Sequence, residues 1–272
     1  MHIVVPIKQV PQSSDVKMDP VTGTMIRSGS ASVLNPLDLY AIETALRLKE
    51  RWNATVTAVT MGPASAVKIL KEALSMGCDE AVHLSAREFS GSDTYATSYI
   101  LAEAIKKIGN VDLVITGERA TDGDTAQVGP GIAAWLEIPV VSYVASLNLV
   151  SPSEFTAERL IEEGYQQVQG TLPALLTVVK EIADVRLPTL RGKKRSMDTT
   201  IPVWGVREVD PDRSKIGLKG SPTRVVKIET PKVSRSCRTL VIGEELSTEV
   251  AVSELVEFLE TRSLLGREDD DA

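Results

Sequence analysis

Residues 111–136 read VDLVITGERATDGDTAQVGPGIAAWL, and the fold class follows from this stretch. A β-branched apolar run, 111–116, predicts a strand. A loop rich in glycine and polar residues comes next, and then a short helix containing Ile132 and Leu136. A strand that leads through a loop into a helix is the unit of a parallel sheet covered by helices.

The same unit recurs toward the N-terminus. Runs of apolar residues predict strands at Ile3–Ile7, Ala54–Met61 and Ala81–Leu84. Residues Val16–Arg27 alternate around DPVTG, which predicts a hairpin. Helix-period segments separate the strands, so we expect an α/β fold. It is a mostly parallel, Rossmann-like sheet with helices on both faces.

Capping residues set the helix boundaries. Asn35 is the predicted N-cap of a helix with Pro36 at its first position. Another helix opens at Gly62-Pro63 and ends at Gly77. A further helix is capped by Asp93 or Ser92 and stops at Gly109-Asn110.

The pattern changes after about residue 145. Phe155–Ile161 and Ala174–Val179 predict added or antiparallel strands at one side of the sheet. Prolines interrupt every run between 201 and 247, and an amphipathic helix around Leu255 follows. We therefore expect a nucleotide-binding α/β domain at 1–200 and an extended arm that wraps another chain at 201–272. The alternative is that the arm belongs to the same core as β-rich structure.

Composition excludes several classes of protein. The 272 residues carry 30 Lys and Arg against 37 Asp and Glu, a net charge of −7, which argues against a nucleic-acid binder. No apolar run approaches the roughly 20 residues that cross a bilayer, so we expect a cytoplasmic protein without membrane insertion.

The sequence offers no metal site and no catalytic motif. Cys78 and Cys237 are isolated and are expected to be inert thiols, and His2 and His83 have no partners at metal-ligand spacing. GxGxxG, P-loop and HExxH motifs are all missing.

Ligands of open parallel sheets bind beyond the carboxyl ends of the strands. Three segments should meet there: 6–11, 60–63 and 117–130. In the last segment Gly123 lets the backbone approach a ligand, and main-chain N–H groups from Asp124 to Val128 suit a phosphate. Asp122 and Asp124 would repel that phosphate, but carboxylates also accept hydrogen bonds from ribose or cap exposed N–H groups. The alternative is a surface turn that only caps a helix.

A basic segment, RLPTLRGKKR at 186–195, stands out in an acidic chain. Five basic residues surround two leucines in this segment. An exposed leucine with basic neighbours can anchor and steer a partner protein. A solvated loop without a partner is the alternative.

These segments together resemble the electron transfer flavoprotein beta-subunit family, almost from end to end. The resemblance is carried by IVVPIKQVP at 3–11, KMDP with Gly23-Thr24, Asn35-Pro36, Met76-Gly77 and, most specifically, the loop at 117–130. It implies a nucleotide site made of Pro6, Asn35, Pro36, Leu37, Asp38, Met61, Gly117, Glu118, Arg119, Ala120, Thr121, Asp122, Gly123, Asp124, Thr125, Ala126, Gln127 and Val128.

The resemblance also implies a function. Conventional members hold AMP in this pocket, whereas the DGDTAQV loop at 122–128 is similar to that of electron-bifurcating members, which hold FAD. NADH is then the electron donor, and the cofactor supplies the chemistry, so no catalytic side chain is expected. A nucleotide-binding regulatory module of stress-protein type is the alternative from another class.

The family implies three kinds of partner. They are an electron transfer flavoprotein alpha subunit, an acyl-CoA dehydrogenase or reductase, and a low-potential acceptor such as ferredoxin or flavodoxin. Docking to the dehydrogenase is expected through Leu190, with Arg191, Lys193 and Lys194 beside it. The chain departs from the family pattern just before this segment, with ADVR at 183–186 where many relatives carry NEPR.

Overall fold

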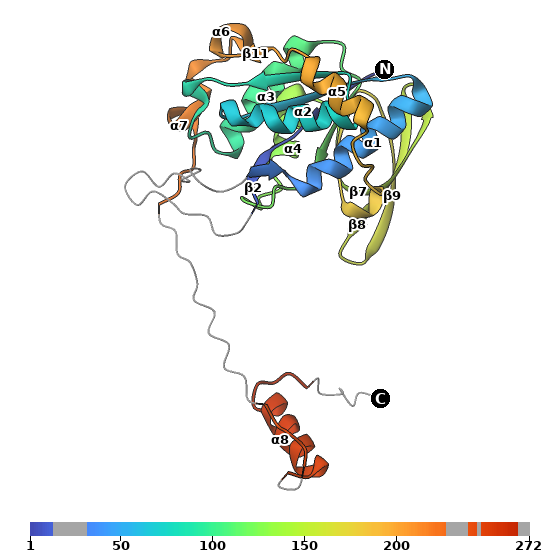
Figure 1. The fold of residues 1–272 in the computed structure, drawn as a ribbon, viewed down its shortest axis with the longest axis vertical. Helices are drawn as coiled ribbons and strands as arrows, with labels where there is room; N and C mark the ends of the chain where they lie inside the picture. Colours follow the sequence, from blue (N-terminus) through green and yellow to red (C-terminus); the bar gives the residue numbers. More distant parts are fainter. Residues whose placement is uncertain (13–31, 227–238, 244–245, 266–272) are drawn as a thin grey trace. The chain divides into compact units, whose positions relative to one another are not determined.

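The computed structural model describes residues 1–12, 32–226, 239–243 and 246–265. Figure 1 shows the chain as a ribbon, with helices packed around a sheet. This sheet has nine strands in the order β11-β5-β4-β1-β6-β10-β7-β8-β9. The strands are β1 (His2–Pro6), β4 (Thr55–Met61), β5 (Glu80–Leu84), β6 (Leu113–Gly117), β7 (Val140–Ser151), β8 (Glu154–Ile161), β9 (Gly164–Thr171), β10 (Ala174–Val178) and β11 (Val203–Trp204). A separate antiparallel pair joins β2 (Gln9–Pro11) to β3 (Ser32–Leu34).

The α-helices are α1 (Pro36–Trp52), α2 (Val67–Met76), α3 (Thr94–Ile108), α4 (Val128–Leu136), α5 (Leu190–Asp198), α6 (Val206–Val209), α7 (Gly217–Gly220) and α8 (Thr248–Glu260). Pro36 opens α1 as predicted. Asp93 caps α3 by accepting a hydrogen bond from the N–H of Ala96 at 3.0 Å. Gly77 ends α2 with a φ of 138°, which a side chain would disfavour.

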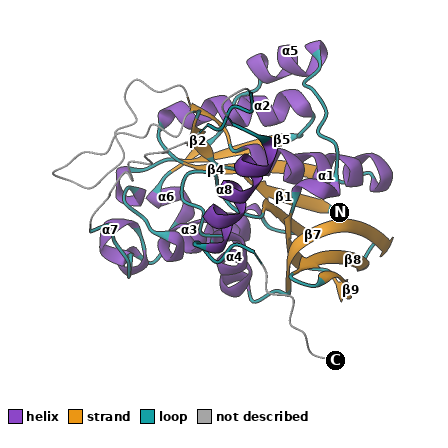
Figure 2. Cartoon of the chain, turned by 90° about the horizontal axis from the view of Figure 1, so that it is seen from below, coloured by secondary structure: helices purple, strands orange, loops and turns teal. Residues whose placement is uncertain are grey.

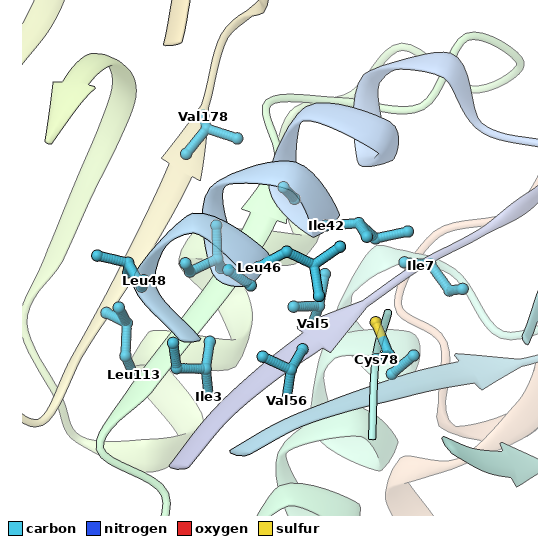
Figure 3. Packing of buried hydrophobic residues seen from close by; sticks show 14 of the residues in the cluster. Ile3, Val5, Ile7, Ile42, Leu46, Leu48, Val56, Cys78, Leu113 and Val178 are labelled. Carbon is cyan, nitrogen blue, oxygen red and sulfur yellow. The ribbon is translucent and has the colours of Figure 1, made fainter. Parts of the chain in front are cut away.

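Helices cover both faces of the sheet, as the strand and helix alternation predicted. Along β1, Ile3 and Val5 pack beside Ile42 and Leu46 of α1 (Figure 3), in a cluster that also contains residues of α2. Val4 belongs to the cluster on the other face, with residues of α3 and α4. A strand that is buried on both faces is apolar throughout. Strands β7, β8 and β9 form an antiparallel extension at one end of the sheet (Figure 2).

The prediction for Ala174–Val179 at the side of the sheet was wrong. The strand there, β10, lies inside the sheet and pairs parallel with both β6 and β7. All five residues of β10 are buried, which is the pattern of a central strand. The chain therefore leaves the sheet through the β7–β9 extension and returns to fill the position beside β6.

The division of the chain also differs from the expected one. The first compact unit extends to Ile228, and the second is Glu229–Ala272. Residues 203–204 form β11 beside β5, and Val206, Val209 and Ile216 are buried in the core. The stretch from 201 to 226 therefore packs on the α/β unit, despite its prolines, because its few apolar side chains cover α3 and the edge of the sheet.

Within the second unit, α8 forms where the amphipathic pattern predicted a helix. Its Val252, Leu255 and Phe258 side chains are about half exposed. The hairpin predicted at 16–27, Cys237 and the acidic end at 268–271 lie outside the described residues.

We predict that the folded α/β unit requires the residues up to Ile228 and not only those up to Thr200. A chain ending at Ile228 should have the same free energy of unfolding as the first unit has within the full-length chain. A chain ending at Thr200 loses Val206, Val209 and Ile216, whose burial is worth about 1.5–3 kcal/mol each. Urea unfolding of both truncations checks this, and equal midpoints would contradict the boundary.

Candidate functional site

The carboxyl ends of β1, β4 and β6 meet at one edge of the sheet, because these strands are parallel neighbours. Pro6, Met61 and Gly117 are their last residues. Segments that are far apart in the sequence are therefore brought to the edge where ligands of such sheets bind.

Asn35 ties the long loop after β6 to the start of α1. Its side chain does not cap α1, contrary to the prediction. Instead the Asn35 amide donates to the carbonyl oxygen of Arg119 at 2.9 Å and accepts from the N–H of Thr121 at 3.3 Å. Asn35 is 1% exposed, so these bonds hold the loop from inside the protein.

Asp38 is a buried carboxyl between the ends of β1 and β6. It accepts a hydrogen bond from the Lys8 N–H at 2.7 Å. Its other oxygen lies against Gly117, where a Cβ would sit 2.6 Å from Asp38 Oδ1, so only glycine fits there. Burial raises the pKa of Asp38 to about 7, although the hydrogen bonds and the Lys8 charge act in the opposite direction.

The two loop carboxylates are held by basic side chains. Lys8 Nζ pairs with Asp122 at 2.6 Å, and the Asp122 side chain is only 7% exposed. Arg119 pairs with Asp124 at 2.8 Å, and the Asp124 side chain is 63% exposed. These pairs reduce the repulsion that a bound phosphate would meet. Lys8 was missed as a site residue, and its only signal was its place directly after a strand.

The loop keeps several hydrogen-bond donors available. Helix α4 begins at Val128, so the N–H groups from 124 to 127 belong to the loop. Among the described residues, the main-chain N–H groups of Gly123, Thr125 and Ala126 have no acceptor. The positive φ values fall at Asp124 (52°) and Ala126 (54°), and not at Gly123. Unpaired N–H groups in a turn can bind an anion such as a phosphate.

Within the part of the chain that the structure describes, two buried hydroxyls at the same edge have no hydrogen-bond partner. Thr60 precedes the last residue of β4, and Thr116 precedes the last residue of β6. Buried hydroxyl groups are normally hydrogen-bonded, so these two mark the edge as a place for a polar ligand.

The structure thus joins Asn35–Asp38 to the loop after β6 through direct contacts. Pro6 and Met61 stand at the ends of β1 and β4 at the same edge, but among the described residues no hydrogen bond links either of them to the loop. Leu190, Arg191, Lys193 and Lys194 belong to α5, which packs on α2 (Figure 1). The predicted docking loop is therefore partly a helix, and the Thr189 hydroxyl caps it by accepting from the Gly192 N–H at 2.9 Å.

A hollow of ≈ 390 Å³ between α3 and α4 lies apart from the Asp38 contacts. Its lining includes Tyr95, Trp135 and Gln127 and is mostly apolar. We place the candidate site at the polar loop instead, because a phosphate needs N–H donors and cations.

The two histidines and Cys78 lie outside the candidate site, and both histidines have structural hydrogen-bond partners. His2 hydrogen-bonds to Thr57 at 2.8 Å, and His83 to the Gly62 carbonyl at 3.1 Å. Burial raises the pKa of the Cys78 thiol to about 12, so it stays protonated. The described residues contain no cluster of metal-binding side chains, and no described helix is long and apolar enough to span a bilayer.

Comparison with known proteins gives consistent matches. The model of the "Electron transfer flavoprotein domain" matches residues 22–207. An electron transfer flavoprotein subunit beta from Thermoanaerobacterium thermosaccharolyticum is 41% identical, over 97% of this chain and 100% of that protein. The caffeyl-CoA reductase-Etf complex subunit CarD of Acetobacterium woodii is 43% identical, over 94% and 95%. Protein FixA of Azorhizobium caulinodans is 40% identical, over 94% of each chain.

We predict that Asp38 makes stability depend on pH. An unfolded chain releases this proton near the ordinary pKa of 3.8, whereas the folded chain holds it until about 7. The folded state therefore loses stability as pH rises between these values, by on the order of 4 kcal/mol at most. Asp38→Asn should lose less stability over this range in urea unfolding at about pH 5 and about pH 8. Parallel pH curves for the two proteins would contradict the prediction.

Proposed function

The chain belongs to the electron transfer flavoprotein beta-subunit family and has an electron-transfer role, and we propose that it binds FAD at the loop of 117–128 as part of an electron-bifurcating heterodimer. The observation that carries this proposal is the loop itself. Asn35, Lys8 and Arg119 hold the loop open at the carboxyl edge, with unpaired N–H groups at Gly123, Thr125 and Ala126.

The residues of the edge fit the phosphate and sugar parts of such a nucleotide. The N–H groups of the loop would hold the pyrophosphate, and Lys8 and Arg119 would keep the local charge favourable. Asp122 is buried in its ion pair, so Asp124 is the carboxylate free enough to accept from a ribose hydroxyl. Asp38 holds the main chain at Lys8 and lies against Gly117, from which the loop begins.

A bound FAD would supply hydride acceptance from NADH and onward electron transfer, while the protein supplies binding and orientation. The bifurcating type is supported by the small residues at 123, 125 and 126, which leave room for a flavin nucleotide. Electrons from NADH would then reach an acyl-CoA dehydrogenase or reductase and a low-potential acceptor such as ferredoxin or flavodoxin. The name of the Acetobacterium woodii relative places that protein in a complex with a CoA-ester reductase.

Gly123→Val tests the nucleotide site. A Cβ at Gly123 would lie 3.9 Å from Lys8 Nζ, an ordinary contact, and Gly123 does not have a positive φ. The folded chain therefore accommodates valine, and the side chain should obstruct only the ligand. We expect the purified heterodimer to fall from about two flavins to about one, the remaining flavin being that of the alpha subunit. Absorbance and mass spectrometry of the released nucleotides measure this.

The same measurement on the wild-type complex separates the two family types. One FAD together with one AMP would overturn the bifurcating proposal and favour a conventional carrier with a structural nucleotide. Unchanged flavin content in Gly123→Val would instead show that the nucleotide lies elsewhere.

The second unit, Glu229–Ala272, is proposed to bind the alpha subunit. The exposed apolar side chains of α8 support this, because a helix with such a face is usually covered by a partner. A chain ending at Ile228 should therefore keep its fold but fail to co-purify with a tagged alpha subunit. Recovery of the heterodimer at wild-type yield would remove the second unit from the interface.

Docking to the dehydrogenase is proposed at Leu190, whose side chain is 87% exposed. Leu190→Ala should weaken binding to the dehydrogenase by about 2 kcal/mol, because a buried anchor is lost. Titration of the heterodimer with an acyl-CoA dehydrogenase measures this. Leu218→Ala removes another exposed leucine from the first unit and should have no effect. If the wild type, Leu190→Ala and Leu218→Ala bind the dehydrogenase with equal affinity, Leu190 is not the docking site.

A further inference from the structure

The basic segment at 186–195, called the docking segment below, is bound at its start by α1. Arg186 donates to Glu43 through its Nε at 2.7 Å and through a terminal nitrogen at 3.2 Å. It also donates to both carboxylate oxygens of Glu50, and its main-chain N–H bonds Glu43 at 3.2 Å. Arg47 adds a bond from α1 to the carbonyl oxygen of Asp184 at 3.1 Å.

The acceptor in this contact is itself buried. Glu43 is 3% exposed, and a carboxylate at that depth needs charged partners. Burial alone would raise the pKa of Glu43, but the hydrogen bonds from Arg186 and Arg47 hold it below its ordinary value. The bond to Arg186 likewise lowers the pKa of Glu50. Glu43 is therefore ionised at neutral pH, and removal of Arg186 would leave a buried charge with Arg47 alone.

The end of the docking segment is bound by α2. Arg195 donates from one terminal nitrogen to the carbonyl oxygens of Leu74 and Cys78, at 2.8 and 2.5 Å. Between the two arginines, Gly192 lies directly on α2, since a Cβ there would be 2.1 Å from the Ser75 carbonyl oxygen. Only glycine permits this close packing of α5 on α2.

The five basic residues of the docking segment therefore divide into two groups. Arg186 and Arg195 lie at the surface but donate hydrogen bonds to other parts of the chain. Arg191, Lys193 and Lys194 are exposed and form no ion pair with any residue that the structure describes. Leu187 and Leu190 are 85% and 87% exposed. The cations that face outward and the apolar side chains thus stand on a segment fixed at both ends.

We propose that Arg186 and Arg195 are positioning residues that clamp the docking segment to α1 and α2, so that the surface for the partner dehydrogenase is formed before binding. This inference rests on the proposed docking function. A segment that is already ordered loses less conformational entropy on binding, which favours slow dissociation. Arg191, Lys193 and Lys194 instead steer the encounter, and their effect depends on salt.

The test uses the heterodimer and an acyl-CoA dehydrogenase that accepts electrons from it. Arg186→Lys keeps the charge but cannot reproduce the forked contacts with Glu43 and Glu50. We expect faster amide hydrogen exchange by at least tenfold in the docking segment and at least fivefold weaker binding, with an unchanged salt dependence. Lys193→Ala should instead leave amide hydrogen exchange in the docking segment unchanged and reduce the salt dependence of binding.

Glu50→Gln provides a milder variant, because Glu50 is an exposed side chain on α1 outside the docking segment. It should speed exchange and weaken binding in the same direction as Arg186→Lys, and the two effects should not be additive. Glu103→Gln removes the ion pair between Glu103 and Lys106 within α3 and is the matched control. It should change neither the hydrogen exchange of the docking segment nor the affinity for the dehydrogenase.

Unchanged exchange and affinity in both Arg186→Lys and Glu50→Gln would overturn the clamp. If these variants speed exchange while Leu190→Ala leaves affinity unchanged, the segment is clamped but does not dock the dehydrogenase. That result would overturn both the proposed docking site and the role of the clamp in docking, while the contacts of Arg186 with α1 would still order the segment.

Discussion

The buried carboxyl of Asp38 fixes the position of everything at the carboxyl edge of the sheet. It accepts a hydrogen bond from the main chain after β1, stands in the first turn of α1 and lies against the last residue of β6, which has to be glycine. The side chain of Asn35, three residues before it, holds the loop after β6 by hydrogen bonds to the loop's main chain. Because a buried carboxyl is costly to ionise, Asp38 lowers the free energy of unfolding above its pKa, while its contacts define the position of the loop.

Helix α1 connects the two functional regions of the chain. Its first turn carries Asp38 at the candidate nucleotide site, and its middle and end carry Glu43 and Glu50, which hold Arg186. The helix is anchored in the core through Ile42, Leu46 and Leu48 (Figure 3). In the proposed function, one helix would thus carry contacts for both the nucleotide site and the docking segment, which fixes the distance between them.

In the proposed function, the chain contributes binding groups and a bound flavin nucleotide supplies the redox chemistry. The described histidines are engaged in structural hydrogen bonds, the Cys78 thiol is protonated and buried, and the carboxylates of the loop are paired. Such a site orients a nucleotide through main-chain donors. The same donors suit any adenine nucleotide, so a loop of this design can be adapted to AMP or FAD by the size of its side chains.

The sequence by itself determined the local elements: the alternation of strands and helices, Pro36 at the start of α1, the Asp93 cap and the glycine ends of α2 and α3. These depend on neighbouring residues, so they can be predicted from short windows. The exposure of Leu190 also followed from its basic surroundings.

Only the tertiary structure decided which distant residues meet. β10 looked like an edge strand because its place beside β6 depends on pairings across the chain. Residues 203–226 looked like an arm because their apolar residues are few, and their burial depends on α3 and the β5 edge of the sheet. Asn35 was predicted to cap a helix but binds the loop after β6, 84 residues away. Arg186 was predicted to be one of a group of basic residues in a surface segment but binds Glu43, 143 residues away. Side-chain hydrogen bonds over such separations follow from the packing of the elements, which local sequence does not encode.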